Sequence, residues 1–426
     1  MTPRGKVVVV GQGYVGLPLA MRASEVGYDV VGFDVDTGRI AHLAAGDSYV
    51  GDVPAARLVA ALAGGRYRPS ADPTDLADFD VAVVTVPTPL RDGAPDLSYI
   101  EDASQLLAAY LRAGACVVLE STTYPGTTDE LVAPLLEQGS GLAAGTEFHL
   151  GYSPERINPG DPNATLEGTP KVVSGIDAAS LERVQSFYDD LVVRTVPVSG
   201  TREAELTKLL ENTFRHVNVA LVNELAMFAA DLGIDVWEAI DAADTKPFGF
   251  MRFEPGPGVG GHCLPIDPSY LAWKVQSELG APFRFVELAN DVNDFMPDYV
   301  VRRLEAGLHR RATTLEGARV LILGLAYKPE TGDAREAPAL RIAAILAARG
   351  AVVSAADPYV VEQVHGLDPA VGLTRVEVTP EVLAGVDAVV VVTPHAAFDL
   401  AEVVAHAPFV LDTRRRVPPA PNVERL

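Results

Sequence analysis

Cysteine is scarce in this sequence, and long hydrophobic runs are missing from it. Only two of the 426 residues are cysteine, too few for the disulfide framework of a small secreted protein. One of them, Cys116, lies in an apolar strand-like run and is not expected to be reactive. No apolar stretch approaches the roughly 20 residues of a membrane-spanning helix. The first residues do not resemble a secretory signal. We therefore expect a soluble cytoplasmic protein that does not bind a membrane.

Basic residues are also scarce relative to acidic ones. The sequence has 34 Lys and Arg against 57 Asp and Glu, a formal net charge of −23. Nucleic acids and anionic membranes bind through basic patches, so neither is expected as a partner. An anionic small molecule would need a locally basic pocket. The length and a hydrophobic content of 48% are ordinary for a globular enzyme of two or three domains.

Runs of β-branched residues alternate with helical patterns in two separate parts of the chain. In the first part, strands are expected at Lys6–Val10, Val30–Phe33, Val81–Val86 and Cys116–Glu120. Helices are expected at Leu17–Val26 and Tyr99–Ala113. Further strands on the far side of this sheet are expected at Lys171–Ser174 and Val192–Val196. In the second part, strands are expected at Arg319–Gly324, Val352–Ala355, Ala388–Thr393 and Phe409–Leu411, and a helix is expected at Ala337–Arg349. Such alternation predicts doubly wound parallel sheets.

A long helical pattern separates the two parts. Apolar residues recur at helical spacing over Glu203–Leu232, Gly233 suits the end of the helix, and more helix follows at Asp235–Ala242. This length exceeds the mean helix of about 11–12 residues, so the helix is expected to join two domains or to form a dimer interface.

The predicted fold class is therefore α/β, with two Rossmann-like doubly wound domains joined by a long central helix and a helical middle domain. The domains are expected at residues 1–199, 200–314 and 315–426. The proline-rich tail, Arg414–Leu426, is expected to be loosely held.

Three glycines, Gly11, Gly13 and Gly16, lie directly after the first expected strand and before the first expected helix. They would permit a tight turn, the approach of a pyrophosphate, and close packing of helix on strand. A strand–helix turn without a ligand can share this pattern. However, Asp34 ends the second strand, where a carboxylate accepts from ribose hydroxyls and repels a 2′-phosphate. We therefore expect NAD as the cofactor, with contacts from Gly11, Gly13, Tyr14, Val15, Gly16, Asp34 and Arg39.

Two other strand ends carry candidate ligand contacts. Pro87 and Thr88 follow the third main strand, and Thr122 follows the fourth. Open α/β sheets bind ligands at the carboxyl ends of their strands. On position alone, a cofactor or substrate contact and an ordinary turn are equally good interpretations.

Cys263 is the best candidate for a nucleophile, because it lies in a segment rich in glycine and proline, Pro255–Asp267. Little side-chain bulk would hinder a substrate carbonyl there. Lys208 and Asn212 are four residues apart on the long helix and so share a face. Each residue has a plainer interpretation: a helical lysine is usually solvated, an asparagine is more often at the surface, and Glu155 could simply bind a backbone amide.

Seven motifs follow one another along essentially the whole chain. They are Gly11–Leu19, Val86–Pro89, Glu120–Thr123, Ser153–Arg156, Lys208–Asn212, Gly258–Asp267 and Gly324–Pro329. In this order and spacing the chain resembles the nucleotide-sugar 6-dehydrogenase family, whose members act on UDP-glucose, UDP-N-acetylglucosamine or UDP-N-acetylmannosamine.

The resemblance implies a four-electron oxidation of the sugar C6 hydroxyl to a uronic acid, with NAD as the hydride acceptor. Cys263 would capture the aldehyde as a thiohemiacetal, and the thioester formed from it would be hydrolysed. A thiolate is the nucleophile, so Lys208 would lower the pKa of the thiol. Lys208 and Asn212 would also stabilise the oxyanions.

The resemblance implies further roles as well. Asp267 and Thr122 would position a water or a proton relay, and Glu155 would be the acid or base in thioester hydrolysis. The diphosphate would contact Lys328, and Arg252 would reach the substrate of a neighbouring subunit. The complete set of expected substrate contacts is Glu155, Arg156, Lys208, Asn212, Arg252, Gly260, Lys328, Arg335 and Arg414. No metal is expected.

Two positions depart from parts of the family. Pro159 replaces a second glutamate of some UDP-glucose enzymes, and Ala337 replaces a serine of many relatives. The substrate is expected to be UDP-N-acetylglucosamine or UDP-glucose, and the assembly a homodimer through the long helix. A simple two-electron β-hydroxyacid dehydrogenase is an alternative, although it needs neither the cysteine segment nor a second nucleotide fold. A non-catalytic NAD-binding relative is another.

Overall fold

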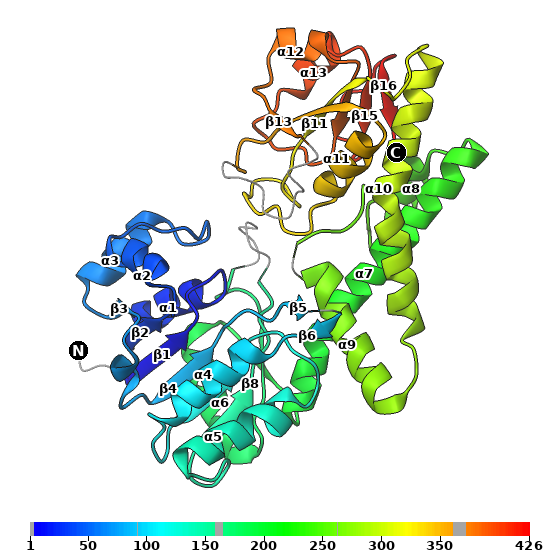
Figure 1. Ribbon diagram of the computed structural model, residues 1–426. Coiled ribbons are helices and arrows are strands. Elements are labelled where there is room, and N and C mark those ends of the chain that lie inside the picture. The colour runs from blue at the N-terminus through cyan, green and yellow to red at the C-terminus, as the bar shows by residue number, and fades with distance from the viewer. Residues whose placement is uncertain (1–3, 92, 158–164, 262, 361–371) are drawn as a thin grey trace. The chain divides into compact units, whose positions relative to one another are not determined.

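The computed structural model describes residues 4–91, 93–157, 165–261, 263–360 and 372–426. The chain forms two compact units, Met1–Glu211 and Asn212–Leu426, and the division falls inside one long helix. Both units are α/β, which confirms the predicted fold class (Figure 1). Within the described ranges, no helix is both long and apolar enough to cross a membrane.

The first unit contains a six-stranded parallel sheet in the order β3-β2-β1-β4-β7-β8. Its inner strands are buried on both faces and are therefore almost continuous runs of valine and other apolar residues. The strands are β1 (Lys6–Val10), β2 (Asp29–Phe33), β3 (Tyr67–Ser70), β4 (Val81–Val84), β7 (Cys116–Leu119) and β8 (His149–Tyr152).

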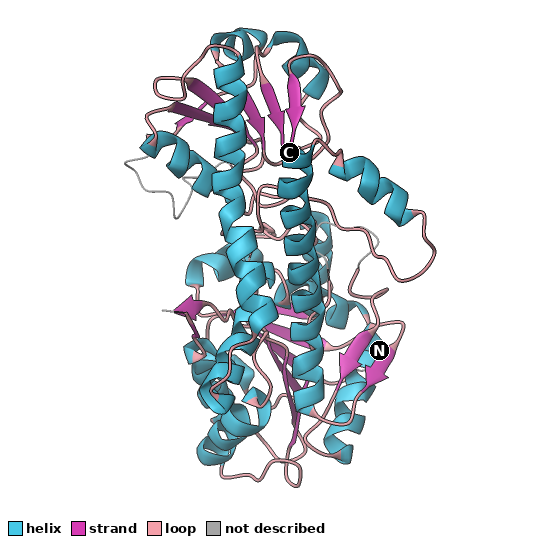
Figure 2. Cartoon of the chain, turned by 90° about the vertical axis from the view of Figure 1, so that its right-hand side faces the viewer, coloured by secondary structure: helices cyan, strands magenta, loops and turns pink. Residues whose placement is uncertain are grey.

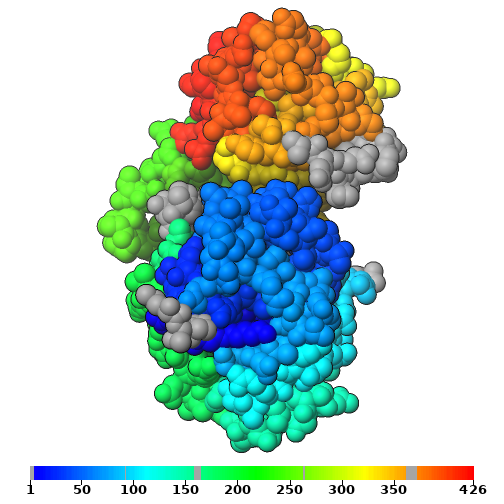
Figure 3. Space-filling view, turned by 90° about the vertical axis from the view of Figure 1, so that its left-hand side faces the viewer, coloured from blue at the N-terminus to red at the C-terminus, as the bar shows by residue number. Residues whose placement is uncertain are grey.

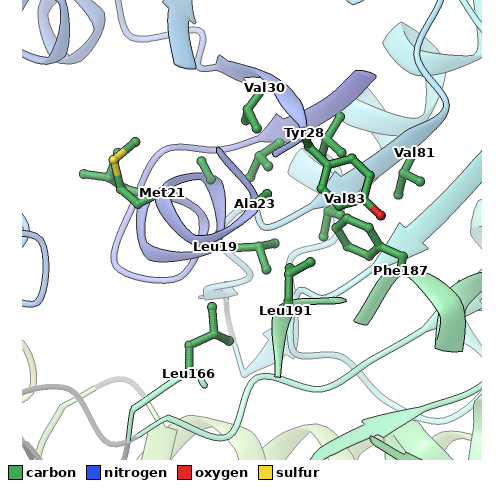
Figure 4. Packing of buried hydrophobic residues seen from close by; sticks show 14 of the residues in the cluster. Leu19, Met21, Ala23, Tyr28, Val30, Val81, Val83, Leu166, Phe187 and Leu191 are labelled. Atoms are coloured by element: carbon green, nitrogen blue, oxygen red, sulfur yellow. The ribbon is translucent and has the colours of Figure 1, made fainter. Parts of the chain in front are cut away.

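Alternate side chains of β1 enter two different cores. Val7 and Val9 lie in a cluster that includes Phe187, whereas Val8 and Val10 lie in the cluster on the other face. Figure 4 shows part of the first cluster. The surrounding helices are α1 (Gly16–Glu25), α2 (Thr37–Ala44), α3 (Ala55–Ala63), η1 (Pro73–Leu76), α4 (Ser98–Ala108), η2 (Thr128–Val132), α5 (Ala133–Ser140) and α6 (Ala178–Leu191). The blue helices α2 and α3 form part of the surface of this unit (Figure 3).

The two strands expected on the far side of the sheet form a separate pair. β9 (Lys171–Val173) and β10 (Thr195–Pro197) are parallel partners in a two-stranded sheet. The N–H of Ser174 donates to the carbonyl of Tyr152 at 3.1 Å, which attaches the pair to the end of β8. A short antiparallel hairpin is formed by β5 (Leu90–Arg91) and β6 (Ala94–Pro95).

The second unit contains another six-stranded parallel sheet, in the order β13-β12-β11-β14-β15-β16. Numbered within each sheet, the strand order is the same as in the first unit, so the two sheets share one topology. The strands are β11 (Arg319–Leu323), β12 (Val352–Ala356), β13 (Thr374–Arg375), β14 (Ala388–Val391), β15 (Val410–Asp412) and β16 (Val423–Arg425).

The prediction that the tail, Arg414–Leu426, is loosely held was wrong. Its last residues form β16, which pairs in parallel with β15 at the sheet edge. The indole N–H of Trp237 donates to the carbonyl of Leu426 at 3.2 Å, and Leu426 is only 5% exposed. The open edge of β15 offers unpaired backbone groups to any segment that reaches it. The prolines of the tail all lie before β16, so they do not prevent this strand from pairing.

The helices of the second unit begin within α7, which runs over 32 residues from Thr201 to Leu232, and the long helices are prominent in Figure 2. Residues 255–261 of the glycine-rich segment form a loop, and Cys263 begins a helix. The remaining helices are α8 (Val236–Asp244), α9 (Cys263–Leu279), α10 (Arg284–Arg310), α11 (Pro338–Ala348), α12 (Pro380–Gly385) and α13 (Leu400–His406).

Candidate active site

The turn after β1 contains two glycines that the surrounding backbone requires. Gly11 has a φ of +94°, and a Cβ there would lie 2.8 Å from the main-chain oxygen of Thr85. A Cβ on Gly16 would lie 1.9 Å from the main-chain oxygen of Gly11. At Gly13, by contrast, a Cβ would meet no described atom within 4 Å. The space beside Gly13 is what a pyrophosphate at the start of α1 requires. The other predicted contacts in this turn are Tyr14 and Val15.

Asp34 is buried beside this turn at the end of β2. Its Oδ2 accepts from the N–H of Gln12 at 2.8 Å and from Arg39 at 2.9 Å, and its Oδ1 accepts from the N–H of Asp36 at 3.0 Å. A carboxylate has about four lone-pair sites, so Asp34 keeps accepting capacity for a ribose hydroxyl. The residues of the turn and this acid therefore fit the adenosine and pyrophosphate parts of NAD.

Tyr67 and Tyr49 support the turn through Gln12, and sequence reasoning missed both. The Gln12 side chain is buried, and its Oε1 accepts from the hydroxyl of Tyr67 at 2.9 Å. The hydroxyl of Tyr49 donates to the carbonyl of Gln12 at 2.5 Å, and the Arg39 guanidinium lies 5.7 Å from the Tyr49 ring centre. Such contacts join residues distant in sequence, and no local pattern signals them.

The ends of β4 and β7 lie together because these strands are neighbours in the sheet. The hydroxyl of Ser121 donates to the carbonyl of Val86 at 2.8 Å and connects the two ends. Of the predicted contacts there, Thr88 is buried, Thr122 is partly exposed and Pro87 is exposed. The structure thus places all three at the carboxyl edge of the sheet, on the same edge as the glycine turn.

Glu155 belongs to a buried charged cluster that the sequence did not reveal. Lys171, at the start of β9, contacts Glu120, and its Nζ lies 3.2 Å from Oε2 of Glu155. The Lys171 and Glu120 side chains are 3% and 0% exposed. The hydroxyl of Tyr188 donates to Glu120 at 2.8 Å. Oε1 of Glu155 accepts from the N–H groups of the next two residues, each at 2.6 Å.

One lysine therefore interacts with two buried carboxylates, and their pKa values move in opposite directions. Burial raises the pKa of Glu120 to about 7, although Lys171 opposes this shift. Burial acts in the same direction on Glu155, but Lys171 and the hydrogen bonds to its carboxylate hold the pKa of Glu155 below its ordinary value. Glu155 is therefore ionised near neutral pH and can accept a proton there.

Lys208 is next to Glu155 in the first unit. Its Nζ donates to the main-chain oxygen of Glu155 at 2.5 Å, and the residue is only 8% exposed. The plain interpretation of a solvated helical lysine therefore does not apply. The neighbouring Arg156 pairs with Glu211 at 2.6 Å and donates to the carbonyl of Pro170 at 2.6 Å.

Asn212 and Asp267 are in direct contact in the second unit. Nδ2 of Asn212 donates to Oδ2 of Asp267 at 2.5 Å, and both residues are buried. Cys263 precedes Asp267 by one helical turn of α9, so both lie on one face of that helix. The first turn of a helix is an electropositive environment that lowers the pKa of a thiol. The Cys263 side chain lies outside the described part of the structure, so its approach to other groups stays a prediction.

The segment before Cys263 packs against the loop that follows β11. The N–H of Gly261 donates to the carbonyl of Arg335 at 3.0 Å, and a Cβ on Gly261 would lie 2.8 Å from the ring of Tyr327. A Cβ on Gly260 would lie 2.9 Å from the Cβ of Tyr327. The Arg335 guanidinium is paired with Asp333 at 2.7 Å. These glycines are required by close packing.

Three further cations predicted to bind substrate lie in the second unit. The Nζ of Lys328 lies 5.6 Å from the ring centre of the preceding tyrosine. Arg252 pairs with Asp241 at 2.8 Å. Arg414 lies so close to Gly256 that a Cβ there would be 2.3 Å from its Nη1, and burial lowers the pKa of Arg414 to about 10.

The remaining cysteine, Cys116, is buried in β7, and burial raises its pKa to about 12. It is therefore not a thiolate at neutral pH, as the sequence predicted. Among the described residues, no group of three or more His, Cys, Asp and Glu side chains is arranged to hold a metal ion. Pro159, which bears on the choice of sugar, lies outside the described residues.

Replacing Lys171 by methionine should lower the free energy of unfolding by about 3–5 kcal/mol near pH 8, because two buried carboxylates lose the cation that they share. The loss should shrink toward about pH 5.5. Without Lys171, which lowers the pKa of both carboxylates, the pKa values of Glu120 and Glu155 rise, and an acid whose folded-state pKa is raised favours the folded state more as the pH falls. Urea unfolding over a pH series measures both effects.

The matched control is Lys246→Met, which removes an exposed lysine and should change stability by less than about 0.5 kcal/mol at every pH. A loss for Lys171→Met that is as small as the control, or that grows as the pH falls, would contradict the role assigned to Lys171.

Comparison with family models identifies three consecutive domains. Residues 5–192 match the NAD binding domain of the UDP-glucose/GDP-mannose dehydrogenase family, residues 202–295 match its central domain, and residues 321–419 match its UDP binding domain. Together these matches cover most of the chain.

Individual relatives agree with the family models. The chain is 41% identical over 357 residues to UDP-N-acetyl-D-glucosamine 6-dehydrogenase of Pseudomonas aeruginosa, covering 83% of each protein. It is 34% identical to UDP-N-acetyl-D-mannosamine dehydrogenase of Pyrococcus horikoshii, covering 92% of this chain and 90% of the other. The solved UDP-D-ManNAc dehydrogenase from Pyrococcus horikoshii superposes with a TM-score of 0.88 at 33% identity, covering 99% and 98%. The chain therefore belongs to the UDP-glucose/GDP-mannose dehydrogenase family and is an NAD-dependent nucleotide-sugar dehydrogenase.

Proposed function

We propose that the chain oxidises the C6 hydroxyl of a UDP-sugar to a carboxylate in two successive two-electron steps, with Cys263 as the nucleophile. The observation that supports this most is the hydrogen bond between Asn212 and Asp267. Asp267 follows Cys263 by one helical turn of α9, and its carboxylate accepts from the amide of Asn212 on α7. NAD, held at Gly11–Gly16 and Asp34, accepts a hydride in each step.

The proposed reaction comprises two hydride transfers and one hydrolysis. The C6 hydroxyl loses a proton and a hydride and becomes an aldehyde. The thiolate of Cys263 adds to the aldehyde carbon, and the resulting thiohemiacetal loses a second hydride and its hydroxyl proton to give a thioester. Water then cleaves the carbon–sulfur bond, which releases the uronic acid and restores the thiol. Asn212 and Lys208 would donate to the oxyanions of the tetrahedral species.

Glu155 is proposed as the base that activates the hydrolytic water. Lys171 and two backbone N–H groups outweigh burial and keep its carboxylate ionised near neutral pH, the form that accepts a proton, while the lowered pKa makes it a weaker base than an ordinary glutamate. Thr122, at the end of β7, and Asp267 would position the water and relay its proton. Lys171 would act through Glu155 by keeping its carboxylate ionised, and is therefore a positioning residue.

The nucleotide part of the substrate is proposed to bind the second unit, which contains the match to the UDP binding domain. Lys328, Arg335 and Arg414 are the proposed diphosphate contacts, Gly260 lies in the segment beside them, and Arg252 would contact the substrate of a partner subunit. A simple β-hydroxyacid dehydrogenase has no use for such a domain, so this alternative is disfavoured.

The proposed sugar is N-acetylglucosamine, with glucose as the second candidate. The relative from Pseudomonas aeruginosa, at 41% identity, is a UDP-N-acetyl-D-glucosamine 6-dehydrogenase. The residue at position 159 is proline, as in many acetylhexosamine enzymes and unlike some UDP-glucose enzymes. Both observations favour a substrate with an acetamido group at C2.

A homodimer is proposed through an apolar stripe along α7. The stripe consists of large apolar side chains that recur every three, four or seven residues and are between 42% and 72% exposed: Leu206, Leu210, Phe214, Leu221, Leu225, Phe228 and Leu232. An apolar face this long is unusual on a monomer and is typical of a subunit interface. A second copy of the same helix would cover it with the same surface.

The proposed reaction predicts two molecules of NADH for each UDP-sugar consumed, and no free aldehyde. Measurement of NADH and product for UDP-N-acetylglucosamine, UDP-glucose, UDP-N-acetylmannosamine and dTDP-glucose would also rank the substrates by kcat/KM. Cys263→Ser should stop acid formation, whereas Cys116→Ser should retain it because Cys116 is buried in a strand. A ratio of one NADH with release of aldehyde would refute the thioester scheme.

Gly13→Ala should weaken NAD binding at least about tenfold, equivalent to roughly 1.4 kcal/mol, while the thermal midpoint stays within about 2 °C. A methyl group there meets no described protein atom within 4 Å, so a loss of affinity reports the space taken by the cofactor. Gly51→Ala is the control, since a Cβ at Gly51 is equally unhindered. Unchanged NAD affinity in Gly13→Ala would argue against a pyrophosphate at this turn.

The double substitution Leu221→Asp and Leu225→Asp should convert the dimer to monomers, because each charge would have to be buried at the interface. Light scattering after size-exclusion chromatography measures the mass. Val193→Asp changes a side chain that is 85% exposed in the first unit and should leave the mass unchanged. A dimer that survives the double substitution would mean that another surface holds it together.

A further inference from the structure

The two sheets share a turn as well as a strand order. Gly11 follows β1 and donates its N–H to the carbonyl of Phe33 at 2.8 Å, and Gly324 follows β11 and donates to the carbonyl of Ala356 at 2.9 Å. The two glycines have φ of +94° and +88°. The residue after each acceptor is an aspartate: Asp34 in the first unit and Asp357 in the second. Asp357 therefore occupies the position from which Asp34 would bind a ribose.

The two carboxylates differ in how many further hydrogen bonds they can accept. Oδ2 of Asp357 accepts from the N–H groups of Leu325 at 2.7 Å and Ala326 at 3.0 Å, and Oδ1 accepts from those of Tyr359 and Val360 at 2.8 and 2.9 Å. Four backbone donors already match the roughly four lone-pair sites of a carboxylate. A fifth donor, the imidazole of His395, lies 3.0 Å from Oδ2. Asp357 is therefore saturated and unsuited to a ribose hydroxyl.

His395 has no exposed side-chain surface and lies between two aromatic rings. The ring centres of Tyr359 and Phe398 are 5.0 and 5.6 Å from that of the imidazole. The N–H of Glu330 donates to Nδ1 of His395 at 3.1 Å. Because Nδ1 accepts, the neutral ring must carry its proton on Nε2 and donate it to Asp357. His395 thus connects the end of β12 to the backbone at Glu330.

Glu330 lies in the loop 327–336, and its backbone is in a conformation that needs support. Its φ is +59°, in the left-handed region that a residue with a Cβ rarely adopts. Its carboxylate accepts from the N–H of Ala396 at 2.7 Å and from the hydroxyl of Tyr359. The backbone and the side chain of Glu330 are therefore both held, the first by His395 and the second by its neighbours.

This loop has two connections to the proposed site. It includes Lys328 and Arg335, the proposed diphosphate contacts. Its residues Tyr327 and Arg335 also pack against Gly260 and Gly261, with the Gly261 N–H to Arg335 carbonyl distance at 3.0 Å. A displacement of the loop would therefore move both the cations and the backbone that leads into Cys263.

We propose that His395 is a positioning residue for the nucleotide-sugar site: paired with Asp357, it closes the ribose position of the second nucleotide fold and fastens the loop 327–336 instead. The second fold thereby loses the ability to bind a dinucleotide in the manner of the first and gains a rigid diphosphate loop. The proposal rests on the proposed binding of the nucleotide sugar to the second unit, and the test treats the role of Lys328 separately.

The test compares His395→Phe with His395→Gln. Phenylalanine keeps a ring between Tyr359 and Phe398 but removes both nitrogens, whereas glutamine restores one donor and one acceptor. By calorimetry, His395→Phe should weaken UDP binding at least about tenfold, as expected for the loss of two buried hydrogen bonds, and glutamine should recover most of it. The dissociation constant of NAD, which binds in the first unit, should change less than about twofold.

Tyr359→Phe provides a milder variant, since this residue is 38% exposed and loses only the hydroxyl that contacts Glu330. It should weaken UDP binding about two- to fivefold with no effect on NAD. If His395→Phe does not fold, this variant still tests the loop. Unchanged UDP affinity in Tyr359→Phe and in any folded His395→Phe protein, or an equal loss of UDP and NAD affinity, would overturn the proposal.

Lys328→Ala separates the two hypotheses. If it weakens UDP binding while the His395 and Tyr359 variants do not, the diphosphate contact is right and the positioning role is wrong. If it leaves UDP binding unchanged while His395→Phe weakens it and His395→Gln recovers it, the loop matters through other groups, and only the role of Lys328 is refuted.

Discussion

Each half of this chain depends on a buried aspartate that accepts hydrogen bonds from the turn after the first strand of its sheet. Asp34 accepts from Gln12 in the first unit, and Asp357 accepts from Leu325 and Ala326 in the second. A buried N–H without an acceptor costs about as much as a lost hydrogen bond, roughly 1–3 kcal/mol. The shape of the turn, and any ligand group that binds to it, therefore depends on this carboxylate. The two carboxylates differ in one respect: Asp34 can still accept a hydrogen bond from a ligand, whereas all the acceptor sites of Asp357 are occupied.

A second constraint is the sharing of one buried cation by two acids. The sequence left open whether Glu155 is a chemical group or a simple acceptor of backbone amides. The structure shows the backbone amides bound to Glu155, and these hydrogen bonds together with Lys171 lower the pKa of its carboxyl and keep it ionised. Glu120 bears the opposite shift, with its pKa raised to about 7. One buried carboxylate, Glu155, thus stays ionised in this strongly acidic chain, while the raised pKa falls on its neighbour Glu120.

Several elements of the fold were predicted from local sequence patterns alone. The strand runs, the glycines of the first turn and the long helix all follow from patterns within about ten to thirty residues. Lys171 and His395 were missed because their meaning comes from partners 51 and 38 residues away. The tail was mispredicted for the same reason: Val423–Arg425 is a strand because the edge of β15 is available to it. Composition cannot report a partner that is distant in sequence.

The glycines before Cys263 gain a different explanation from the one that sequence alone suggests. An open approach for a substrate would be served by any small residues. Gly261, however, has a φ of +78° and lies against the ring of Tyr327, and Gly256 lies against Arg414. A side chain at either position would force the segment away from the second unit's nucleotide fold. Since α9 begins two residues after Gly261, the start of that helix is located by these contacts. The position of the cysteine backbone is thus tied to the same loop that is proposed to hold the diphosphate, and substrate binding and nucleophile placement share one support.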